Sequence, residues 1–140
     1  MFNVLPAINW LSVLVAFIAY FLLGALWYLL LFPRSYRASL GKENEPATGQ
    51  KQEPLYVVGP AVCALVITIT CAVLLQALRI DTYGNALRFA LLVGVGYLFT
   101  NTVNIAINPN MPRPFFYGLI TGSYHLLGMV LVNLILVAMQ

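Results

Sequence analysis

The sequence predicts an all-α membrane protein, a bundle of four transmembrane helices joined by short loops. Apolar residues make up 61% of the 140 residues and charged residues only 8%, whereas about a quarter of a soluble domain is charged. The apolar residues also gather in four long runs without a Lys, Arg, Asp or Glu. This composition, with a net charge of +3, excludes an ordinary soluble enzyme, a disordered segment and a nucleic-acid binder.

Each of the four runs is long enough to cross a membrane. A helix of about 20 residues spans a hydrocarbon core of ~30 Å. Without water to satisfy its backbone groups, a spanning segment has to be a helix unless it closes into a barrel, and the alternating polarity of barrel strands is missing. We therefore expect one domain over 1–140 with helices at 8–32, 55–79, 86–108 and 114–139.

The ends of the runs carry helix signals. Asn9 is a candidate N-cap beside Trp10 at the membrane interface. The run 8–32 is too long for a cleaved signal peptide and lacks a basic segment before it, so we expect a retained span. Pro60 leaves the carbonyl of Tyr56 without a partner, which predicts a kink in the second helix or a place near its start.

The loops differ in length and charge. Loop 33–54 is long and polar, and its residues 34–40 are suited to a short interfacial helix. Five cationic residues lie on loops 33–54 and 108–114, namely Arg34, Arg37, Lys42, Lys51 and Arg113, against two, Arg79 and Arg88, on the other side. We expect the protein in the cytoplasmic (inner) membrane. The positive-inside rule then predicts that loops 33–54 and 108–114 lie in the cytoplasm and both termini outside.

Polar residues inside the spans are the candidates for function, because they are expensive at that depth. In a regular helix Tyr97, Asn101 and Asn104 share one face. A turn near Met111 brings residue 101 level with residue 121. We therefore expect one inward-facing set, whose members are the candidates for binding a solute or lining a pore: Tyr97, Asn101, Asn104, Thr121 and His125.

Two interpretations of this set stay open. Polar side chains commonly hydrogen-bond across spans and hold helices together, and small residues let the backbones approach. Five glycines suit such helix packing: Gly24, Gly94, Gly118, Gly122 and Gly128. The other interpretation is a polar cavity or pore in which His125 titrates. No Asp or Glu lies in any span, so antiport through a membrane carboxylate has no candidate residue.

The residues needed for catalysis or cofactor binding are scarce. The four acids lie in loops, and the single histidine provides no pair of axial haem ligands. Cys63 and Cys71 lie ~12 Å apart along one helix, too far for a disulfide. We expect no enzyme activity, no cofactor and no metal site.

Several short motifs resemble one family. They are Asn9-Trp10-Leu11, Gly24-Ala-Leu-Trp-Tyr28, Ala86-Leu-Arg-Phe89, Asn101 with Asn104, Arg113-Pro-Phe115, and Leu119-Ile-x-Gly-x-Tyr-His-Leu126. Together they resemble the small four-span bacterial membrane proteins of domain-of-unknown-function family seventeen sixty-one. The resemblance implies four helices with both termini on one side. The family supplies no established activity, so no catalytic residues carry over.

Two functions remain. The first is a small carrier or channel for a solute or ion, working as an oligomer through the polar residues of the spans. The second is an accessory or scaffold subunit that packs against a larger membrane complex. The partners expected are the lipid bilayer and either further copies of the chain or other membrane proteins, and not nucleic acid.

Overall fold

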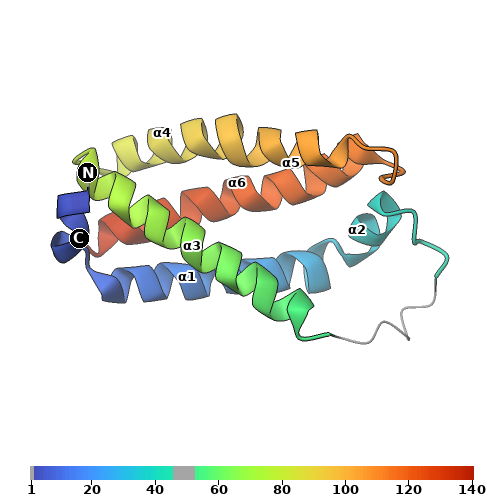
Figure 1. Ribbon diagram of the computed structural model, residues 1–140, viewed down its shortest axis with the longest axis horizontal. Coiled ribbons are helices and arrows are strands. Elements are labelled where there is room, and N and C mark those ends of the chain that lie inside the picture. The colour runs from blue at the N-terminus through green and yellow to red at the C-terminus, as the bar shows by residue number, and fades with distance from the viewer. Residues whose placement is uncertain (1, 46–52) are drawn as a thin grey trace.

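The computed structural model describes residues 2–45 and 53–140, which form four long helices (Figure 1). All four are long and apolar enough to cross a membrane, which confirms the predicted fold. The elements are η1 (Phe2–Ala7), α1 (Trp10–Ala25), η2 (Leu26–Leu31), α2 (Pro33–Ser39), α3 (Leu55–Ala77), α4 (Tyr83–Val93), η3 (Gly94–Phe99), α5 (Thr100–Ala106) and α6 (Pro114–Ala138). The first span combines α1 with η2, and the third combines α4, η3 and α5.

Side-chain caps and prolines set the starts of the helices. The Asn9 side chain accepts hydrogen bonds from the backbone of Leu11 and Ser12, as expected of an N-cap. Thr82 caps α4 in the same way, so the third span begins three residues before its expected start. Pro60 lies near the start of α3, the second of the two places predicted for it. The short helix expected at 34–40 is confirmed as α2.

Helix α6 is the centre of the bundle. In its most apolar window 56% of the residues are buried, against 22 to 28% in the other three spans. Figure 1 shows α6 between α1 and the third span, with α3 crossing over it diagonally. The outer surfaces of the other spans carry large apolar side chains such as Leu22, Val66 and Leu92, as expected for helices in contact with lipid.

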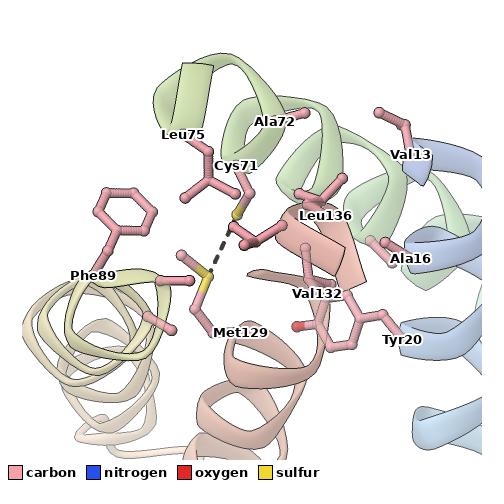
Figure 2. Close-up of a cluster of buried hydrophobic side chains, with 14 of the residues drawn as sticks. Val13, Ala16, Tyr20, Cys71, Ala72, Leu75, Phe89, Met129, Val132 and Leu136 are labelled. Atoms are coloured by element: carbon pink, nitrogen blue, oxygen red, sulfur yellow. Dashed lines mark hydrogen bonds between the residues drawn. The ribbon is translucent and has the colours of Figure 1, made fainter. Parts of the chain in front are cut away.

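The core lies where α1, α3, α4 and α6 meet, toward the ends of the chain. Figure 2 shows Tyr20, Leu75, Phe89 and Leu136 entering it from these four helices. At its centre the Cys71 and Met129 sulfur atoms are 3.5 Å apart. Cys63 is exposed on the same helix as Cys71, so the two cysteines lie in different environments.

A side-chain interaction between residues far apart in the sequence stabilises each end of the bundle. The Asn9 side chain donates to the Met139 carbonyl over 2.7 Å, which joins the two chain ends. At the opposite end Arg113 pairs with Glu43 over 2.6 Å. A hydrogen bond from its own backbone and then the Arg113 guanidinium lower the pKa of Glu43, so this carboxyl group is ionised at neutral pH. Lys51, one of the cations counted for orientation, lies outside the described residues.

Five glycines permit close helix approach. A Cβ on Gly128 would collide with the Tyr20 ring, and one on Gly122 would lie 2.6 Å from the Phe99 ring. At the other three a Cβ would lie 2.7–2.9 Å from its nearest neighbour: Gly24 against Tyr124, Gly94 against Leu126, and Gly118 against Val103. The structure thus places all five packing candidates where two helices touch.

We predict that Gly128→Ala destabilises the protein by about 1–3 kcal/mol, because the new methyl group forces the buried Tyr20 ring out of its site. Gly84→Ala is the matched control, since nothing lies within 4 Å of the added carbon. Thermal unfolding in detergent measures both. Equal melting temperatures for the two variants would contradict the packing of α1 on α6.

Candidate functional site

The single histidine is paired inside the bundle. Tyr20 Oη and His125 Nδ1 share a hydrogen bond of 2.7 Å. Tyr20 lies near the middle of the span Trp10–Leu31 and His125 near the middle of Pro114–Ala138. The pair therefore lies at half the depth of the membrane, where an ionisable side chain requires a polar partner.

Four more tyrosine contacts extend this pair toward the α2 end of the bundle. The Tyr20 and Tyr124 rings stack with their centroids 5.3 Å apart. Edge-on pairs have centroids 5.2 Å apart for Tyr124 and Tyr28 and 4.8 Å apart for Tyr28 and Tyr36. The Tyr36 and Tyr117 rings are tilted, with centroids 5.9 Å apart. We call these five residues the tyrosine column. Aromatic pairs in such geometries add about 0.5–1.5 kcal/mol each beyond their burial.

The tyrosine column was not predicted. Tyr28, Tyr36 and Tyr117 come from η2, α2 and α6 and pack on one another. A signal was present, because Tyr20 and Tyr28 lie two helical turns apart, as do Tyr117 and Tyr124. Burial, and then the neighbouring Tyr117, raise the pKa of Tyr36 to about 12, so this hydroxyl keeps its proton at neutral pH.

The five site candidates are not brought together. Thr121 is buried and His125 is largely covered inside the bundle, as expected. Tyr97 is 73% exposed, and Asn101 and Asn104 are exposed on the outer surface of the third span. The expectation that all five side chains face one another is therefore wrong for the three residues of the third span.

The π-helix η3 explains the error. At 3.6 residues per turn, Tyr97, Asn101 and Asn104 would continue the buried face of Ala90 and Gly94. A π turn holds one extra residue and bonds five residues back. The Thr100 backbone N–H and side chain both donate to the carbonyl of Val95. Every later residue is thereby rotated by about 100°.

The predicted alignment of the third and fourth spans along their length was nevertheless correct. Residues 101 and 121 were expected side by side, and the structure places Phe99 against Gly122 and Val103 against Gly118. The π turn thus brings Phe99, Val103 and Ala106 onto α6 in place of the polar residues.

The displaced polar residues form a distinct surface. We call it the outward polar face, and it consists of Gly96, Tyr97, Thr100, Asn101 and Asn104. These residues line a shallow open depression. On this helix the Thr100 and Thr102 hydroxyls donate to backbone carbonyls, whereas Asn101 and Asn104 make no side-chain hydrogen bond to any described residue.

The interior also holds two unpaired polar atoms. The Thr121 hydroxyl and the Asn133 side-chain oxygen are buried without a hydrogen-bond partner in the described structure. Asn133 itself is anchored by its amide, which donates to the Met129 carbonyl over 2.7 Å. Within the described residues no three His, Cys, Asp or Glu side chains gather in a group that could hold a metal.

The comparison with known families supplies an identity. A family model described as "Protein of unknown function (DUF1761)" matches residues 11–137. The chain belongs to the DUF1761 family. No curated protein and no solved structure matches it. Family membership confirms the resemblance seen in the motifs. It assigns no role to the tyrosine column or the outward polar face of this DUF1761 protein.

We predict that Tyr20→Phe lowers stability by about 0.6–2 kcal/mol, because it removes one intramembrane hydrogen bond and keeps the ring. In a double-mutant cycle with His125→Phe, the two losses should be less than additive, since both remove the same bond. The measurement is unfolding in mixed micelles. Strict additivity would show that the two groups do not interact.

Proposed function

We propose that this protein is a non-catalytic membrane subunit that docks onto another transmembrane helix through its outward polar face. The observation that carries the proposal is the exposed and unpartnered Asn101 amide on the outer surface of the third span. Such a group favours a protein neighbour over lipid.

The depth of these groups supports docking. The third span runs from Tyr83 to Ala106, so its midpoint is near residue 94 or 95. At a rise of 1.5 Å per residue, Tyr97 lies about 4 Å, Asn101 about 10 Å and Asn104 about 14 Å from that midpoint. With a core ~30 Å thick, Asn101 lies inside the hydrocarbon. An unpaired amide there costs several kcal/mol, which a polar neighbouring helix offsets.

The extent of the face also supports docking. The polar residues cover only the half of the third span toward Ala106. The outer surface of the other half carries Leu87, Leu91 and Leu92. A path along this surface would meet an apolar wall halfway across the membrane.

The cavity that the described residues form near the chain ends is too small for a solute. It is lined by Ile8, Asn9, Ser12, Ala72, Gln76, Leu136 and Gln140, and its volume is about 10 Å³. That is the space of about one water molecule. Glycine contacts and the tyrosine column fill the bundle elsewhere along α6.

A carrier or channel formed by several copies is the second candidate. The observation in its favour is the open depression lined by Gly96, Tyr97, Thr100 and Asn101. In an oligomer this depression would become part of a shared path. The carrier or channel function predicts that a cysteine at position 101 reacts with a charged, membrane-impermeant thiol reagent. Docking of a helix predicts that the same cysteine is protected.

We predict that a photoreactive phenylalanine derivative at position 97 forms a protein adduct in native membranes. The same derivative at position 56 is the control, because Tyr56 is an equally exposed aromatic residue on α3. Adding Asn101→Leu should lower the adduct yield about threefold to thirtyfold, because the free energy of one or two intramembrane hydrogen bonds with the partner is lost. The melting temperature of the monomer should stay unchanged. Lipid adducts alone at position 97 would refute docking.

The proposed orientation places loops 33–54 and 108–114 in the cytoplasm, with the protein in the inner membrane. Its support is the distribution of Lys and Arg over the loops. We predict that Gly84→Cys is labelled from outside intact cells by an impermeant thiol reagent, whereas Glu45→Cys is labelled only after the cells are opened. The reverse pattern would show the opposite orientation.

A further inference from the structure

We infer that the occupant of the outward polar face is a second copy of this chain, related by a two-fold axis along the membrane normal. The inference rests on the proposed docking function and names its partner. Three properties of the outward polar face support it: the depth of its polar groups, their hydrogen-bonding capacity, and the open space at Gly96.

Depth is the first property. A helix that docks here has to present polar groups near 4, 10 and 14 Å from its own midpoint, matching Tyr97, Asn101 and Asn104. All copies of one chain insert with the same orientation and depth. A two-fold axis normal to the membrane then places each residue level with its own counterpart.

Hydrogen-bonding capacity is the second property. A carboxamide carries both a carbonyl acceptor and two N–H donors. Asn101 and Asn104 can therefore each pair with the same residue of a second copy, with donor meeting acceptor in both directions. No acidic or basic residue lies between 89 and 107, so close approach of two copies brings no like charges together in the hydrocarbon.

Space for a backbone is the third property. Nothing lies within 4 Å of a Cβ added to Gly96, whereas Gly94, only two residues earlier, is closed by Leu126. Gly96, Thr100 and Asn104 follow one another at four-residue spacing and are all exposed. Gly96 and Thr100 form the small-residue pattern through which two transmembrane helices bring their backbones together, and Asn104 adds a hydrogen-bonding group one turn later.

The test is disulfide formation between two differently tagged copies in native membranes. The test variant carries Thr100→Cys together with Cys63→Ser. The parent chain with its own Cys63 is the control, because Cys63 is also exposed but lies on α3. We expect a product carrying both tags from the test variant and none from the parent, since a disulfide needs Cα atoms within about 7 Å.

Two further variants test the contact itself. Gly96→Leu in the test variant should lower the yield of doubly tagged product about tenfold, because the side chain keeps the backbones apart. Gly84→Leu is the matched control, since that glycine is equally open but lies outside the face, and its yield should be unchanged. Equal yields from these two variants, or from Cys63 and Thr100→Cys, would show random collision and overturn the inference.

The outcome separates this inference from the proposed function. If Thr100→Cys gives no doubly tagged product while the probe at position 97 joins to a different protein, the second copy is wrong and docking stands. If the probe at position 97 reaches only lipid and no disulfide forms, both are wrong.

Discussion

The bundle depends on the close approach of the first and third spans to the small residues of α6. Gly128 leaves room for the Tyr20 ring, Gly122 for the Phe99 ring and Gly118 for Val103. Lipid chains are as apolar as leucine, so the hydrophobic effect gives these helices little reason to prefer one another over lipid. Tight van der Waals contact and internal hydrogen bonds take its place, and the Tyr20–His125 bond at mid-depth lies beside the Gly128 contact.

The π-helix η3 converts this packing into two different surfaces. Before it, Ala86 and Ala90 face α6; after it, Val103 and Ala106 do. The same extra residue turns Asn101 away from the bundle. Single π turns are often found at functional sites. Here the turn directs the apolar residues of the third span toward α6 and its polar residues toward the outer surface. That arrangement supports assembly rather than transport in the function that we propose.

The polar residues of the spans thus divide into two groups with different requirements. His125 and the tyrosine column are satisfied within the chain and contribute to its stability. Asn101 and Asn104 have no partner in the described chain, although they lie at or inside the hydrocarbon boundary by depth. A group that is costly in lipid and satisfied only by a neighbour is a means of specifying that neighbour.

The sequence by itself determined the class, the four spans and their helical state, because run length, the cost of unpaired backbone in lipid and the missing alternation of barrel strands leave helices. Its short motifs indicated the family. It also determined that residues near 101 lie level with 121, since the short turn at 108–114 leaves little freedom. Only the tertiary structure decided which way Tyr97, Asn101 and Asn104 face. Facing depends on helical phase, and one π turn, stabilised by the contacts of Phe99 and Val103 with two glycines of α6, shifts that phase without changing the composition of the span.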